Sequence, residues 1–205
     1  MPARGGIFIW TMLAMLAGGS LVSGAPAAWT HEASGLRFPD SIEGKWQRHS
    51  QSLAGKTAAV EYRSRAGWQV NITVKPAAEG ARGPSKLDGD SSSDATPVFR
   101  QELEASVQNL SNGLANARTV SSQRFRVAPQ QKGVIGMKVV VNGRLNDQPT
   151  SREVLLLERN GYFVAFTVEY PEKQWSGAGQ TYTDVAHFIG WPAPAITQSS
   201  TLITK

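Results

Sequence analysis

The sequence has 205 residues, no cysteine, and a formal net charge of +5 from 21 basic and 16 acidic side chains. The absence of cysteine excludes disulfide bonds and also a lipid anchor on a processed N-terminal cysteine. The basic residues are scattered along the chain and never form a dense run, so the excess positive charge does not indicate a nucleic-acid-binding protein.

Residues 1–27 have the pattern of a secretory signal peptide. Arg4 is the only charged residue before an uncharged stretch that extends to Thr30, and residues 7–16 form its apolar centre. We therefore expect an exported protein, either periplasmic or secreted.

Cleavage of this segment is expected before Ala28, because residues 25–27 (Ala-Pro-Ala) place small side chains where signal peptidase needs them. Residues 23–25 (Ser-Gly-Ala) also fit, but they would leave Pro26 just after the cut. The alternative is an uncleaved membrane anchor. A spanning helix needs about 20 mainly apolar residues, and residues 18–20 (Gly-Gly-Ser) interrupt this run.

The first part of the mature chain predicts strands. Residues 57–64 and 70–75 alternate apolar and polar side chains, as half-buried strands do, and Gly67 lies in the hairpin turn between them. Residues 35–39 and 45–50 are expected to form two earlier extended segments.

Residues 76–95 are rich in Gly, Ser and Pro and contain almost no large apolar residue, which predicts a flexible loop insertion. Asp88, Asp90 and Asp94 suggest a calcium-binding loop. The central glycine and distal glutamate of such loops are missing, so we favour a solvated insertion without metal.

A helix is expected to begin after Thr96, which can cap it, with Pro97 in the first helical position. Its apolar residues recur every three or four positions and form one stripe, which predicts packing against a sheet. These residues are Phe99, Leu103, Val107, Leu110 and Leu114.

A second block of strands is expected at residues 120–127, 134–141, 154–157 and 162–170. Asn160-Gly161 predicts a type I′ hairpin turn between the last two strands.

Two other turn signals occur in this block. Residues 146–149 (Asn-Asp-Gln-Pro) can reverse the chain, and so can Asn142-Gly143. The first gives longer and better matched strands, so we expect the turn there and a bulge at Gly143.

Residues 181–189 predict a closing amphipathic helix. Gly190 is expected to cap it in a left-handed conformation, Trp191 to fold back on Ala186, and Pro192 to stop the helix. The tail, residues 195–205, is expected to be disordered.

These elements predict a single α+β domain over residues 28–194. It should contain an antiparallel sheet of about six to seven strands covered by two amphipathic helices, in the order βββ-α-ββββ-α.

Several segments carry a resemblance to a known family: residues 35–39 (Gly-Leu-Arg-Phe-Pro), the strand trio, the long helix, the hairpin block and residues 190–192 (Gly-Trp-Pro). Their order, over residues 29–194, resembles the small exported domains with the fold of the photosystem II subunit PsbP and the envelope protein DcrB. The resemblance implies a non-enzymatic accessory or binding module and carries over no functional residue.

No motif with recognisable catalytic chemistry occurs. His31, His49 and His187 have no second His, Cys or acidic residue at metal-ligand spacing, and no Gly-x-Ser-x-Gly elbow is present in the mature chain. We therefore predict no catalytic residue, metal or cofactor.

Trp68, at a hairpin, and Trp175, between the last strand and the last helix, are candidate binding residues. The favoured function is an exported envelope accessory or binding protein whose partner is another envelope protein or an anionic envelope surface. The alternative is a small periplasmic hydrolase, which would bring His49 or His187 next to a carboxylate.

Overall fold

The structure is a computed structural model that describes residues 27–86, 94–127, 134–172 and 183–192. An antiparallel eight-stranded sheet with the order β3-β4-β5-β6-β10-β9-β8-β7 forms the centre of the molecule. Its strands are β3 (Ser41–Ile42), β4 (Trp46–Ala54), β5 (Thr57–Ser64), β6 (Gln69–Pro76), β7 (Ala115–Arg126), β8 (Ile135–Leu145), β9 (Gln148–Arg159) and β10 (Tyr162–Pro171).

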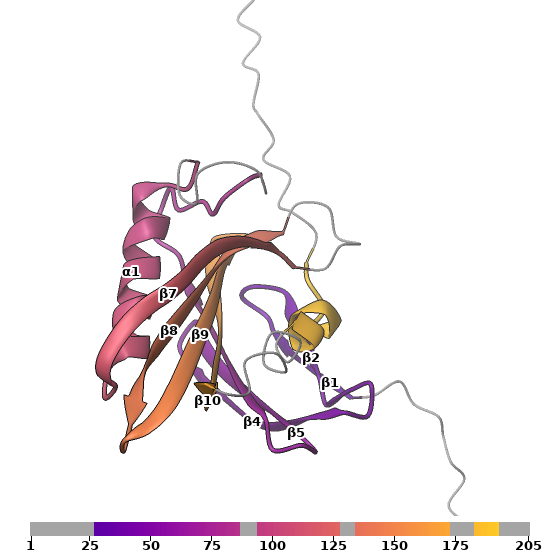
Figure 1. Cartoon of the computed structure of the whole chain (residues 1–205). Coiled ribbons are helices and arrows are strands. Elements are labelled where there is room, and N and C mark those ends of the chain that lie inside the picture. Colours follow the sequence, from indigo (N-terminus) through magenta and orange to yellow (C-terminus); the bar gives the residue numbers. More distant parts are fainter. Residues whose placement is uncertain (1–26, 87–93, 128–133, 173–182, 193–205) are drawn as a thin grey trace, which may run out of the picture.

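The two faces of this sheet have different covers (Figure 1). Helix α1 (Pro97–Ser111) packs on one face, which we call the outer face. The hairpin β1 (Ala28–His31)–β2 (Leu36–Pro39) and a short helix over residues 183–188 pack on the other, the inner face.

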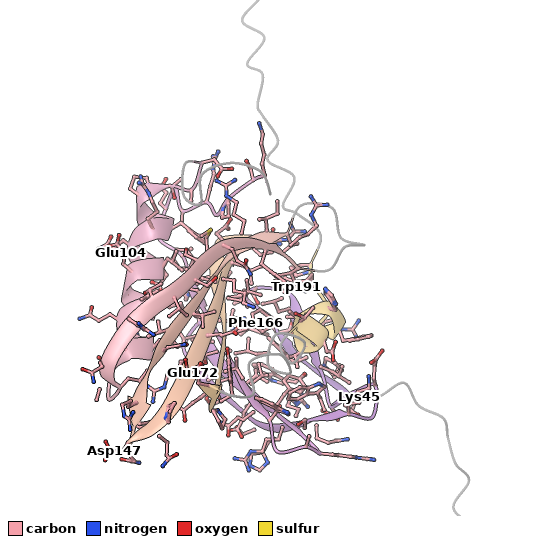
Figure 2. The ribbon with its side chains drawn as sticks, viewed as in Figure 1. Lys45, Glu104, Asp147, Phe166, Glu172 and Trp191 are labelled. Atoms are coloured by element: carbon pink, nitrogen blue, oxygen red, sulfur yellow. The ribbon has the colours of Figure 1, made fainter. Side chains whose placement is uncertain are left out.

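The main core lies on the inner face, where β5, β6, β9 and β10 contribute buried apolar side chains. Phe166 on β10 and Trp191 after the last helix lie together there, with ring centroids 6.1 Å apart (Figure 2). Trp191 Nε1 donates a hydrogen bond to the carbonyl of Ala186 at 2.8 Å, so the expected return of Trp191 onto the helix is confirmed.

The α+β class with a large antiparallel sheet is confirmed, but the expected strand count was too low. The structure has eight strands in the main sheet and a separate two-stranded sheet, and the two strands that were not expected are the short β1 and β3. Two predicted strands are also longer than expected: β7 begins at Ala115 and not at Val120, because residues 115–119 are all exposed and show no alternation of apolar and polar side chains. β9 extends from Gln148 to Arg159, whereas only its apolar segment, residues 154–157, was expected.

The two helices also differ from the prediction. α1 ends at Ser111 and not at Leu114, because Leu114 leads directly into β7. The closing helix is described over residues 183–188, and residues 181–182 lie outside the described part. Among the described residues, no helix combines the length and apolarity that crossing a membrane requires.

Two glycines have roles other than those expected. The bulge lies opposite Gly143, on β7, where Asn116 has a φ of 54° and the register with β8 shifts. A Cβ on Gly143 would lie 2.9 Å from Leu114 Cβ, so glycine there permits close approach of β7.

Gly190 is not a left-handed cap. It forms a β-bridge with Arg37, and a Cβ on it would lie 2.9 Å from Arg37 Cβ. Close contact with β2 therefore explains the glycine.

Candidate functional site

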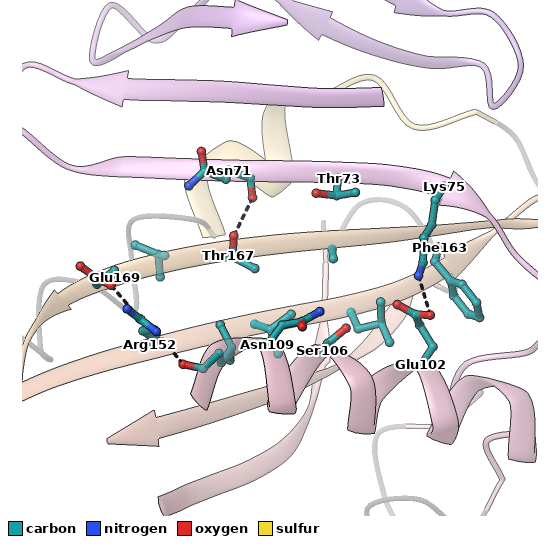
Figure 3. A pocket seen from close by; sticks show the side chains of 15 residues that line it. Asn71, Thr73, Lys75, Glu102, Ser106, Asn109, Arg152, Phe163, Thr167 and Glu169 are labelled. Carbon is teal, nitrogen blue, oxygen red and sulfur yellow. Dashed lines mark hydrogen bonds and ion pairs between the residues drawn. The ribbon is translucent and has the colours of Figure 1, made fainter. Parts of the chain in front are cut away.

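A groove of about 400 Å³ lies on the outer face of the sheet, between α1 and the strands β6 and β10 (Figure 3). Ligand sites in proteins commonly have volumes of about 300–1,000 Å³. The groove is therefore large enough to hold a small molecule or a short segment of a larger one.

One wall of the groove is a polar row on β6. Side chains alternate between the two faces of a strand, so Val70, Ile72 and Val74 enter the inner core while the residues between them face outward. These outward residues are Asn71, Thr73 and Lys75, and all three line the groove.

The opposite wall is a polar row on α1. Glu102, Ser106 and Asn109 lie at positions i, i+4 and i+7, which places them on one side of the helix. They border the apolar side by which α1 contacts β8, β9 and β10, where Phe99 and Leu110 are buried. The two polar rows therefore face each other across the groove.

The floor between these rows is apolar, with Ala165 on β10 at its centre. Ala165 pairs with Thr73 of β6 on one side and with Leu156 of β9 on the other. Leu156, Val154 and Phe163 also line the floor. Ala165 carries only a methyl group, so the space above it in the groove stays empty, whereas a larger side chain would fill it.

Ion pairs lie at both ends of the groove. At one end Lys75 Nζ is 2.7 Å from Glu102 Oε2, which joins β6 to α1. At the other end Arg152 Nε is 2.6 Å from Glu169 Oε2. Arg152 Nη1 also donates to the carbonyls of Leu110, at 2.9 Å, and Asn112, at 2.6 Å. The charges that line the groove thus form two neutral pairs (Figure 3).

The uncharged polar groups of the groove retain hydrogen-bonding capacity. Within the described part of the chain, the side chains of Thr73, Ser106 and Asn109 make no hydrogen bond. Asn71 Oδ1 accepts from Gln69 Nε2 at 3.1 Å, which leaves its NH₂ group available. Both walls can therefore donate to and accept from a bound molecule.

The two tryptophans predicted to bind do not lie in this groove. Trp68 is half-buried at the edge of the inner core, where its ring contacts Tyr170 at a centroid distance of 6.0 Å. Trp175 lies outside the described residues. A binding role for either residue stays a prediction.

The histidines do not assemble a hydrolytic centre among the described residues. His49 is exposed on β4, and His187 is half-buried on the closing helix; within the described ranges neither forms an ion pair. His31 is buried, with Nδ1 2.7 Å from Ser34 Oγ, and burial lowers its pKa. No described group of three His, Cys, Asp or Glu residues is placed to bind a metal ion.

Asp94, one of the three aspartates of the suggested calcium loop, has protein partners. Its carboxylate accepts from the backbone N–H and the hydroxyl of Ser85, both at 2.8 Å, and lies 2.6 Å from Arg124. The Ser85 hydrogen bonds, and then the Arg124 charge, lower the pKa of Asp94 to about 2. Asp88 and Asp90 lie outside the described residues.

Sequence reasoning did not identify the groove. Its walls come from β6 and α1, and one of its ends depends on Arg152 and Glu169, which are far away along the chain. The alternation in residues 70–75 placed the β6 row on one face, but no local pattern shows that this row meets a helix.

The comparisons with known proteins give a likeness of fold. No protein-family model and no curated protein matches the chain. Its structure is similar to the solution structure of cyanobacterial PsbP (CyanoP) from Synechocystis sp. PCC 6803, with a TM-score of 0.48 and 12% identity over 86% of this chain and 99% of that one. It is also similar to PA94 of Pseudomonas aeruginosa, a protein of unknown function, with a TM-score of 0.41 and 12% identity over 83% of this chain and 99% of that one. The expected resemblance to PsbP-like proteins is thus present in the structure as similarity of fold, while the likeness to DcrB stays a prediction.

Proposed function

We propose that this chain is an exported, non-catalytic binding protein of the cell envelope that holds an uncharged polar ligand in the groove between α1 and the sheet. The observation that carries the proposal is the groove itself. Two rows of uncharged hydrogen-bonding side chains face each other over an apolar floor, between two ion pairs. Export is proposed from the pattern of residues 1–27.

An uncharged ligand fits the charge pattern of the groove. Lys75, Glu102, Arg152 and Glu169 already neutralise one another in pairs. A charged ligand would have to compete with one of these pairs, whereas a neutral ligand can use the free amide and hydroxyl groups without breaking either. Neutral saccharides match this chemistry, since they present hydroxyl groups at their edges and C–H groups on their faces.

A binding role also fits the chemical types of the lining side chains. Among the described residues, the groove lining contains no histidine, and the two carboxylates found there are in ion pairs. A general base needs a group that can take up a proton near neutral pH, and a carboxylate beside a cation favours its charged form. Uncharged groups that bind without reacting are what an accessory protein requires.

The test uses one alanine inside the groove and one outside it. Ala165→Leu fills the floor, while Ala59→Leu adds the same group at an exposed position of β5. Ala59 also pairs with Thr73, on the side away from Ala165, so the two variants lie in one row of the sheet. Calorimetric titration with a panel of neutral oligosaccharides should show binding to the wild type and to Ala59→Leu.

Ala165→Leu should lose this binding by at least about tenfold while keeping its far-UV circular dichroism spectrum. If no neutral oligosaccharide binds, or if Ala165→Leu binds as well as Ala59→Leu, the groove is not the ligand site. Binding of acidic oligosaccharides with equal affinity would contradict the assignment of an uncharged ligand.

A further inference from the structure

One edge of the main sheet is open along most of β4. In the described part of the chain, β3 pairs with β4 only at Trp46 and Gln47. Arg48 N then donates to the carbonyl of Asp40 at 2.8 Å. From Ser50 to Ala54, β4 pairs with β5 on one side and with no described strand on the other.

From Ser50 onward this open edge lacks the charges and prolines that usually prevent edge-to-edge pairing, and the register irregularity of β4 lies just before it, between Arg48 and Ser50. Residues 50–54 (Ser-Gln-Ser-Leu-Ala) contain no charged residue and no proline. Natural edge strands are commonly protected by charges, prolines or bulges. The opposite edge, β7, has such protection, because it carries three arginines and two irregularities in its register with β8.

The same segment exposes an apolar side chain over an incompletely covered part of the core. Leu53 is 59% exposed, the highest value among the exposed large apolar residues of the described chain. It pairs with Ala58, which is fully buried, so both side chains belong to the inner face of the sheet. Leu53 also borders a hollow of about 620 Å³ whose other side contains Trp29 and His31 of β1.

We propose that this edge binds the β4 strand of a second copy of the chain, in antiparallel orientation, with Leu53 on the two-fold axis. A two-fold axis pairs a strand with itself antiparallel, so each residue meets its symmetry mate or an equivalent neighbour. With Leu53 on the axis, Ser52 of each copy lies opposite Ala54 of the other, so pairing would join the two sheets through residues 52–54 of both copies.

A second copy fits this edge because the segment is complementary to itself. No charge opposes its own symmetry mate, whereas self-pairing of β7 would bring arginines together. With Leu53 on the axis, the two leucines become a direct cross-strand pair, and each covers the other beside the hollow. The proposal does not depend on the ligand groove, which lies on the outer face of the sheet.

The test introduces charge at the axis. In Leu53→Lys two ammonium groups would oppose each other, and in Leu53→Asp two carboxylates would do so. Leu53 is largely exposed, so both protomers should keep the wild-type circular dichroism spectrum and melting behaviour. Val120→Lys is the matched control, since Val120 is an apolar residue of the other edge strand and is 45% exposed.

Analytical ultracentrifugation of protein produced from the full-length sequence should show a reversible wild-type dimer. Leu53→Lys and Leu53→Asp should each raise the dimer Kd by at least about tenfold, Val120→Lys should not, and an equimolar mixture of the two Leu53 variants should restore dimers. The proposal is overturned if the wild type stays monomeric up to about 1 mM. It is equally overturned if Val120→Lys weakens the dimer as much as the Leu53 variants do, or if the mixture stays monomeric.

Discussion

Replacing Arg152 by methionine should separate the C-terminal end of α1 from the sheet. The guanidinium group joins three elements: it pairs with Glu169 on β10 and donates to the carbonyls of Leu110 and Asn112 at the end of the helix. The last turn of α1 contains no basic residue, so Arg152 supplies from β9 the positive charge that stabilises a helix C-terminus. Methionine keeps most of the aliphatic stem and removes the charge.

The expected loss in the free energy of unfolding is about 2–3 kcal/mol. Hydrogen bonds to charged groups contribute about 1.5–3 kcal/mol each, but the carbonyl of Asn112 is exposed and can bond to water instead. The pair with Glu169 adds less than about 1 kcal/mol, because the Glu169 side chain is 49% exposed. For a domain of this size the loss corresponds to a decrease of roughly 5–10 °C in melting temperature.

Urea denaturation followed by circular dichroism measures this loss, and Arg63→Met is the control. Arg63 also forms an ion pair within the sheet, with Glu61, but its side chain is 50% exposed, so its removal should cost less than about 1 kcal/mol. Amide hydrogen exchange should speed up in α1 for Arg152→Met only. Equal stability of the two variants, with unchanged exchange in α1, would refute the proposed attachment.

Three further changes test how the sheet and its covers fit together. Gly136→Ala should destabilise the fold by about 2–3 kcal/mol in urea denaturation, because the new Cβ would lie 2.5 Å from the carbonyl oxygen of Leu156 in the neighbouring strand; a loss below about 0.5 kcal/mol would contradict this. Burial lowers the pKa of His31, so the folded state favours the neutral ring. The contribution of His31 to the free energy of unfolding should therefore be complete above about pH 6.5 and decrease as the pH falls below that value. Urea denaturation of His31→Phe at several pH values should lack this part of the pH dependence. Trp191→Phe leaves the carbonyl of Ala186 without its indole donor and should lower the melting temperature by roughly 3–6 °C in a calorimetric scan; an unchanged melting temperature would show that the hydrogen bond adds nothing.

Local sequence signals predicted the parts of the fold that depend on neighbouring residues. Asn160 and Gly161 have φ angles of 51° and 77°, as the predicted hairpin turn requires. Asn146 and Asp147 are also left-handed and confirm the other turn. Thr96 Oγ1 accepts from the backbone N–H of Phe99 at 3.4 Å, as a helix cap does.

The missed elements depend on partners that are distant in the sequence. The N-terminal half of β9 contains Ser151, Arg152 and Glu153, which do not suggest a central strand. Glu153 can be fully buried because its carboxylate pairs with Lys138 and accepts a hydrogen bond from Tyr170. No local pattern shows such pairing, so the strand was predicted only where its residues are apolar.

The groove follows from a change in the outer face of the sheet. On β8 and in the middle of β9 the outward residues are apolar, among them Val139 and Val154, and α1 covers them. On β6 they are polar, so no helix is needed there. α1 therefore lies at the boundary between the two regions, with its apolar side on the strands and a polar row towards β6. Ala165, on the strand between them, is too small to close the gap, which makes this single position decisive for whether the boundary is a binding groove or a filled contact.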